Sequence, residues 1–129
     1  MIESERLEKA RAIRRAVLGS DYVDAPGTSP TKLQAAFREF TTANCWGTVW
    51  VRDGLTHKQR SMLNLAMLAV MARWHEFEVH VRGALNNGVT EDEIVEILLQ
   101  AGVYAGVPIA SEGFKIADRV IAQHARTAP

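Results

Sequence analysis

A glutamate and a histidine stand four residues apart at positions 76 and 80, within the stretch ARWHEFEVHVRGALNNG (residues 72–88). On an α-helix, side chains with this spacing lie one above the other on the same face. A carboxylate that is hydrogen-bonded to an imidazole fixes its tautomer and raises its pKa. The pattern predicts that Glu76 orients His80 and that His80 acts as an acid or base near neutral pH. A solvated surface pair without a chemical role is the alternative that the spacing leaves open.

Two arginines and a pair of tryptophans are further candidates. Arg60, near the start of an apolar segment, and Arg52 each carry a guanidinium group, which binds carboxylates in a planar two-point geometry. Either could instead form an ordinary salt bridge. Trp46 and Trp50, on either side of Gly47, would line a pocket or simply pack an irregular segment.

The composition limits the classes of partner. The 129 residues carry fifteen basic and fifteen acidic side chains, so no net field favours nucleic acid or an anionic membrane. Cys45 is the only cysteine, so an internal disulfide is impossible and a cysteine-based zinc site is not expected. Glu76 and His80 supply two ligands without a completing motif, so no metal site is expected either. The N-terminus lacks the apolar region of a secretory signal, and we expect one cytoplasmic domain over residues 1–129.

The periodicity of apolar residues predicts an all-α fold of about six helices. Ser29 and Pro30 look like an N-cap and a first-turn proline. Residues 19–30 read as a long loop and residues 45–55 as an irregular segment. The expected helices cover residues 3–17, 33–44, 57–72, 74–87, from Thr90 to Gly106, and 109–125.

An antiparallel helical hairpin over residues 57–87 is the expected centre of the fold. In its second helix the residues predicted to face the core are Phe77, Val81, Ala84 and Leu85. A parallel stripe that includes Glu76 and His80 borders this face, where burial shifts pKa values. In the first helix the expected core stripe is Leu63, Ala66, Met67 and Val70, although that helix is apolar on nearly all sides.

Four segments together resemble the γ-carboxymuconolactone decarboxylase family. They are WGxxWxRxGL (residues 46–55), Arg60-Ser61, ExxxHxRxAxxNG (residues 76–88) and QxxxYxGxP (residues 100–108). The similarity runs from about residue 18 to residue 117. It implies an alkylhydroperoxidase D-like helical fold, a ring-shaped homo-oligomer (a hexamer or trimer), and a place in protocatechuate degradation, the β-ketoadipate pathway.

The peroxidase relatives of this family carry a CxxC pair followed four residues later by a histidine. Aligning that histidine with His80 puts Arg73 and Glu76 at the cysteine positions, and Ser61 near the glutamate that activates the cysteines. Disulfide chemistry at this site is therefore excluded.

The resemblance implies a small anionic lactone as substrate and no cofactor, because the lactone carbonyl itself accepts the electrons that CO2 leaves behind. His80 would donate a hydrogen bond to that oxygen and act as the acid, with Glu76 orienting it. Arg60, or alternatively Arg52, would bind the spectator carboxylate. Trp46 would wall the ring, and Ser61 would complete the substrate site. Two rivals stay open, namely another small lactone or carboxylate on the same scaffold, and a non-catalytic oligomeric binding protein.

Overall fold

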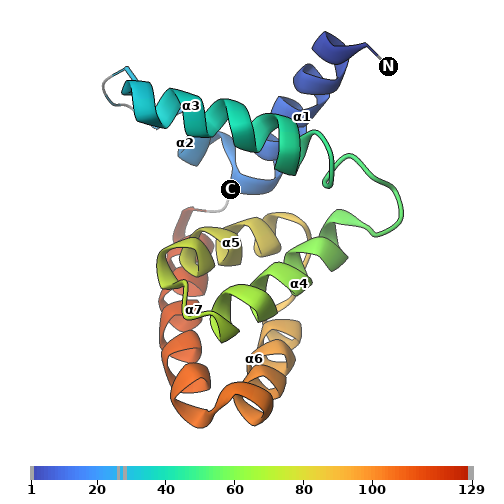
Figure 1. Ribbon diagram of the computed structural model, residues 1–129. Coiled ribbons are helices and arrows are strands. Elements are labelled where there is room, and N and C mark those ends of the chain that lie inside the picture. Colours follow the sequence, from blue (N-terminus) through green and yellow to red (C-terminus); the bar gives the residue numbers. More distant parts are fainter. Residues whose placement is uncertain (1, 26, 28, 128–129) are drawn as a thin grey trace. The chain divides into compact units, whose positions relative to one another are not determined.

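A computed structural model describes residues 2–25, 27 and 29–127, and these residues form helices without any strand (Figure 1). The all-α prediction is confirmed. The chain divides into two compact units, Met1–Thr56 and His57–Pro129. The expected single domain over residues 1–129 stays a prediction. Within the described part of the chain, no helix combines the length and the apolarity needed to cross a bilayer.

The first unit contains three α-helices and one turn of π-helix. Their bounds are α1 Glu3–Leu18, α2 Ser20–Val23, α3 Lys32–Thr41 and η1 Thr42–Trp46. Two expectations are wrong here. The short helix α2 lies inside the segment expected to be loop, and α3 is capped by Thr31 rather than Ser29. The Thr31 hydroxyl accepts a hydrogen bond from the Gln34 amide (3.1 Å) while the Gln34 side chain accepts one from the Thr31 amide (3.0 Å). This reciprocal capping box satisfies two backbone donors, which a cap at Ser29 would leave unpaired.

Gly47 closes the π-turn at a point of close backbone approach. The Arg6 guanidinium of α1 donates hydrogen bonds to the Ala43 carbonyl (2.8 Å) and to the Gly47 carbonyl (3.1 Å). A Cβ atom at position 47 would lie 2.8 Å from the Thr42 carbonyl oxygen and 3.0 Å from that of Ala43. Both neighbours are backbone atoms, so they cannot move aside as a flexible side chain would. The glycine of the WGxxW segment is therefore required by packing.

We expect Gly47→Ala to lower the free energy of unfolding by about 1–3 kcal/mol, the usual cost of forcing a methyl group into a filled space. Chemical denaturation followed by circular dichroism measures this change. Gly54→Ala is the matched control, because a Cβ at position 54 meets no atom within 4 Å. Equal stability of the two variants would show that the close approach at position 47 costs nothing.

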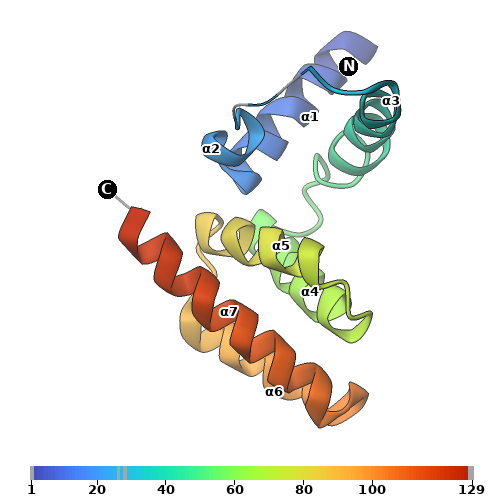
Figure 2. The same ribbon diagram turned by 90° about the vertical axis from the view of Figure 1, so that its left-hand side faces the viewer.

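The second unit consists of two antiparallel helical pairs. Figures 1 and 2 both show α4 beside α5 and α6 beside α7. The expected hairpin over residues 57–87 is confirmed, and Thr90 and Glu93 form a capping box at the start of the helix that follows it. The bounds are α4 His57–Val70, α5 Trp74–Asn86, α6 Glu91–Ala105 and α7 Val107–Thr127. The largest fully buried apolar side chains are Leu65, Phe77, Val81, Ile94, Leu98 and Val120.

A tight turn joins α4 to α5. The Arg73 amide donates to the Leu68 carbonyl and the Ala72 amide to the Ala69 carbonyl, each at 2.9 Å. This pair of bonds is the Schellman motif, which places one residue in the left-handed region. Ala72 occupies that position with φ 56°, where glycine is more usual. The turn fixes where α5 begins, and therefore which of its residues lie in the first turn.

The predicted core stripe of α4 is wrong. Leu63, Met67 and Val70 are about half exposed, at 50%, 51% and 49%. The face that α4 turns to the core of its own unit carries Ser61, Leu65 and Ala69, which are fully buried. Because α4 is apolar on nearly all sides, its periodicity does not distinguish the face inside the unit from an apolar face outside it.

Candidate active site

Side-chain hydrogen bonds fix how α4 and α5 lie against each other. The Asn64 side-chain nitrogen of α4 lies 3.4 Å from Nδ1 of His80 on α5. One end of the hairpin is tied by Asn87, whose side-chain amide donates to the Ser61 hydroxyl (2.9 Å) and to the His57 carbonyl (3.4 Å). Position 64 of α4 therefore faces position 80 of α5, the position of the candidate histidine.

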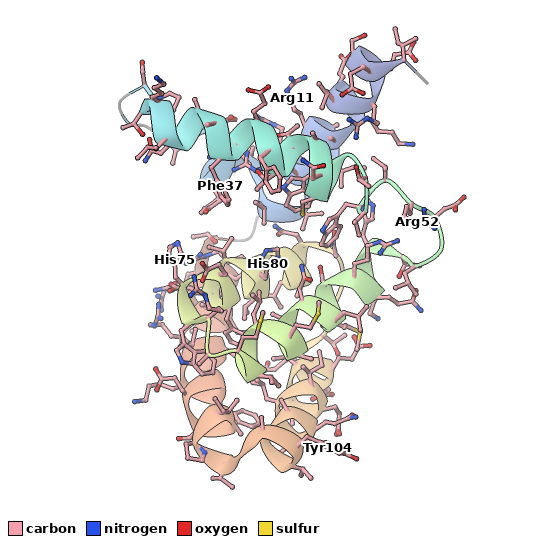
Figure 3. All side chains as sticks on the ribbon, viewed as in Figure 1. Arg11, Phe37, Arg52, His75, His80 and Tyr104 are labelled. Atoms are coloured by element: carbon pink, nitrogen blue, oxygen red, sulfur yellow. The ribbon has the colours of Figure 1, made fainter. Side chains whose placement is uncertain are left out.

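His80 is half-buried in the middle of α5, and Figure 3 shows it together with His75 on the same helix. Burial lowers the pKa of His80 below its ordinary value, and the negative charge of Glu76 raises it only in part. The expectation of a raised pKa is wrong, because removing the imidazolium from water outweighs the distant carboxylate. The ring is therefore neutral at pH 7.

Glu76 is bound at the start of α5 rather than to His80. It occupies the third position of the helix, where a backbone N–H group and the Arg73 guanidinium (3.3 Å) hold it. Its own backbone amide first, and then Arg73, keep the pKa of Glu76 below the usual carboxylate value. A fixed negative charge at a helix N-terminus is favourable in itself. Glu76 therefore acts on His80 through its electric field, and the predicted orienting hydrogen bond is absent from this structure's described residues.

Arg60 and Ser61 are neighbours on α4 with different surroundings. Arg60 is half-buried and lies one helical turn before Asn64, on the same face of α4. Ser61 is fully buried, and its hydroxyl accepts the hydrogen bond from Asn87. Ser61 therefore packs inside the hairpin, and its expected contact with substrate stays a prediction.

Trp46 and Arg52 belong to the first unit. The ring of Trp46 packs on that of Trp50, with centroids 5.0 Å apart and planes inclined by 35°. Both tryptophans are buried, at 5% and 4% exposure. Arg52 is exposed and projects from the segment that follows η1 (Figure 3). Their roles in binding substrate stay predictions.

Two hollows in the second unit lie away from His80. The larger, of about 370 Å³, is lined by residues at the C-terminal end of α7 together with Arg82. The smaller, of about 60 Å³, lies between α6 and α7. Among the described residues, no group of three His, Cys, Asp or Glu side chains is arranged to hold a metal ion. His80, Asn64 and Arg60 thus lie along one face of the α4–α5 hairpin and not in either hollow.

Comparison with known proteins places this arrangement in a family. The model of the carboxymuconolactone decarboxylase family matches residues 35–119. The chain belongs to this family. The resemblance read from the sequence is confirmed, and the helical structure agrees with the alkylhydroperoxidase D-like fold that it implies.

Two relatives carry names that describe a reaction. The chain is 43% identical over 109 residues to the nitrosuccinic acid decarboxylase of Metarhizium robertsii, covering 84% of this chain and 76% of the relative. It is 32% identical over 120 residues to the 4-carboxymuconolactone decarboxylase of Acinetobacter baylyi, covering 93% of this chain and 90% of the relative. Similar enzymes of the family are thus named for different substrates.

The residue beside His80 that the sequence reasoning missed is Asn64. It is the single amide in the apolar run SMLNLAMLAV (residues 61–70). A polar side chain in such a run needs a hydrogen-bond partner, and that requirement is the signal that would have found it. The identity of the partner could not be read from the sequence, because His80 lies on another helix.

Proposed function

We propose that the chain is a cofactor-independent decarboxylase of small dicarboxylic acids whose departing electron pair moves onto an oxygen atom of the substrate. One observation carries the proposal. A half-buried, neutral imidazole, His80, lies on the same face of the α4–α5 hairpin as a guanidinium, Arg60. A neutral hydrogen-bond donor and a cation are the two groups that such a reaction requires. The names of the two relatives support the reaction type.

The two named substrates share a chemical unit. Nitrosuccinic acid and 4-carboxymuconolactone are both substituted succinic acids, in which a single carbon bears a carboxylate, an electron acceptor and a carboxymethyl group. The acceptor is a nitro group in the first and an unsaturated lactone in the second. We therefore propose acceptor-substituted succinates as the substrate class. The first candidate substrate is γ-carboxymuconolactone, which would yield β-ketoadipate enol-lactone. Nitrosuccinic acid is the second candidate, and the 43% identity to the nitrosuccinic acid decarboxylase supports it.

The reaction needs no electron sink from the protein. The bond between the substituted carbon and its carboxylate breaks, CO2 leaves, and the bonding pair moves onto the lactone carbonyl or the nitro oxygen. Water then protonates the delocalised anion at carbon and leaves hydroxide. The barrier falls if a fixed donor stabilises the oxygen on which charge develops, a contribution often worth about 3–4 kcal/mol.

The residues of the hairpin suit these roles. His80, neutral at pH 7, donates its ring N–H to the developing oxyanion, and the replacing proton comes from water instead of from an imidazolium. Arg60 binds the spectator carboxylate, which stays charged throughout. Glu76, fixed at the start of α5, is the weaker candidate for a direct role, since its carboxylate would repel a dianionic substrate.

The test uses the purified chain with three compounds. CO2 release and the ultraviolet spectrum are followed with γ-carboxymuconolactone, with nitrosuccinate, and with methylsuccinate, which has both carboxylates but no acceptor. We expect turnover of at least one of the first two and none of the third. Inertness toward both acceptor-substituted acids would overturn the proposal and favour the non-catalytic binding protein.

We propose, in addition, that the chain assembles with copies of itself, as a hexamer or a trimer. The described residues of the second unit expose several large apolar side chains, and exposed apolar surface often marks a contact with another protein. Those on α4 and directly after it are Leu63, Met67, Val70 and Met71, and those on α6 and at the start of α7 are Leu99, Val103, Tyr104 and Val107. Figure 3 shows Tyr104 projecting from the end of α6, where it is 85% exposed.

We expect Val103→Glu to reduce the molar mass in solution, because Val103 is 82% exposed and a buried charge would oppose its covering by another subunit. Light scattering coupled to size-exclusion chromatography measures the mass. Ser111→Glu, an exposed polar position on α7, is the control and should leave the mass unchanged. A monomeric wild-type chain would refute self-association.

A further inference from the structure

The hydrogen bond between α4 and α5 determines which nitrogen of His80 carries its proton. The Asn64 atom that faces His80 is the side-chain nitrogen, 3.4 Å from Nδ1. An amide nitrogen only donates, so in this amide orientation Nδ1 is the acceptor and carries no proton. In the neutral ring the proton then resides on Nε2.

The same contact opposes protonation of the ring. In the imidazolium both ring nitrogens carry protons, and Nδ1–H would point at the two amide protons of Asn64. In the amide orientation of the structure that arrangement pairs donor with donor, and Nδ1–H gains an acceptor only if the Asn64 amide turns to present its oxygen. It acts in the same direction as burial, which lowers the pKa of His80.

The charged groups around His80 do not override its contact with Asn64. On α5, Glu76 favours the imidazolium, but only as a distant charge already paired with Arg73. From α4, the facing residue is the neutral Asn64, with Arg60 one turn earlier. On α7, Arg119 is bound to Glu78 (2.8 Å) and does not act on the ring.

We propose that Asn64 is the positioning residue of the site, which holds His80 as the neutral tautomer with Nε2–H directed at the substrate oxygen. This inference rests on the proposed function. It gives Asn64 the role of orienting His80, which the spacing of Glu76 and His80 had suggested for the Glu76 carboxylate. A neutral histidine locked in one tautomer is a permanent donor over a wide pH range, because its donation does not depend on a titration near neutrality.

Nuclear magnetic resonance of the full chain labelled with ¹⁵N-histidine tests the tautomer without any substrate. The His80 signals among the four histidines are assigned with His80→Gln. We expect Nε2 to be protonated and Nδ1 to be unprotonated at pH 7. In Asn64→Asp, an isosteric change, the carboxylate accepts from Nδ1–H, so the neutral tautomer reverses and the pKa of His80 rises by at least one unit.

The pH profile of activity supplies the second arm. In the wild-type chain, kcat should stay level as the pH rises above 7, because the neutral ring keeps its donor. In Asn64→Asp the ring loses Nε2–H on deprotonation, so activity should fall at least tenfold as the pH rises through the raised pKa. Asn86→Asp is the control, since it adds the same charge at an exposed position beside His124, away from the site.

Two results would overturn the inference. One is a wild-type ring protonated on Nδ1, and the other is an Asn64→Asp profile that matches the wild type. If none of the succinates is turned over, the proposed function fails, whereas the tautomer measurement still decides whether Asn64 controls His80. The two failures are therefore distinguishable.

Discussion

Replacing His80 with alanine should lower kcat by about 10²–10³-fold, the loss measured when one donor to a developing oxyanion is removed. The fall should appear in kcat more than in KM, because the hydrogen bond strengthens only as charge reaches the substrate oxygen. His80→Gln should recover part of the loss, since a glutamine amide donates a hydrogen bond but cannot transfer a proton at neutral pH. Steady-state kinetics with the best substrate measures both effects.

His75→Gln is the control for this prediction, because His75 lies on the same helix but is exposed and should leave kcat unchanged. Stability gives an independent readout of the buried ring. Because the folded-state pKa of His80 is lowered, the unfolded chain binds more protons below pH of about 6.5. The free energy of unfolding should therefore decrease as the pH falls from that value to the lower folded-state pKa, and His80→Gln should lose this part of the dependence. Wild-type kcat in His80→Ala would remove the imidazole from the mechanism.

The sequence predicted the helices well where their apolar residues were confined to one face. In α5 the predicted core residues Phe77, Val81 and Ala84 are fully buried, and the fourth, Leu85, is half-buried and packs against the core. In α4, apolar side chains occur on nearly every side, so the pattern could not tell Leu65, which is buried, from Leu63, which is half exposed. A helix that is apolar on nearly all sides carries no signal in its sequence for the side that packs against its own unit.

For the candidate site too, the sequence pattern predicted only part of the arrangement. Spacing along one helix singled out His80 as a candidate but paired it with Glu76, four residues away. In the structure the Schellman turn at Ala72 sets the start of α5 and places Glu76 in its first turn, where backbone amides and Arg73 compete for the carboxylate. The partner of His80 comes instead from α4, and the register between two helices depends on their packing, which sequence spacing does not contain.

The second large effect should come from Arg60. We expect Arg60→Ala to raise KM by about 10–100-fold with little change in kcat, because a hydrogen-bonded charge contact is worth about 1.5–3 kcal/mol and the spectator carboxylate keeps its charge in the transition state. The KM of Arg60→Lys should lie between those of the wild type and Arg60→Ala, since lysine restores the charge but not the planar two-point geometry. The measurement is the dependence of initial rate on substrate concentration.

Variants of two other arginines show whether an effect on KM is specific to Arg60. Arg119→Ala removes an exposed guanidinium that is bound to Glu78 on α5, and it should leave KM unchanged. Arg52→Ala tests the alternative clamp from the first unit. If Arg52→Ala raises KM and Arg60→Ala does not, the spectator carboxylate is bound by Arg52. If neither variant raises KM, the proposal that these guanidinium groups bind a succinate dianion is wrong. Methylsuccinate carries the same two carboxylates and should inhibit the enzyme. Its inhibition constant should rise in parallel with KM in the variant that has lost the carboxylate-binding arginine. A parallel rise separates loss of substrate binding from loss of chemistry.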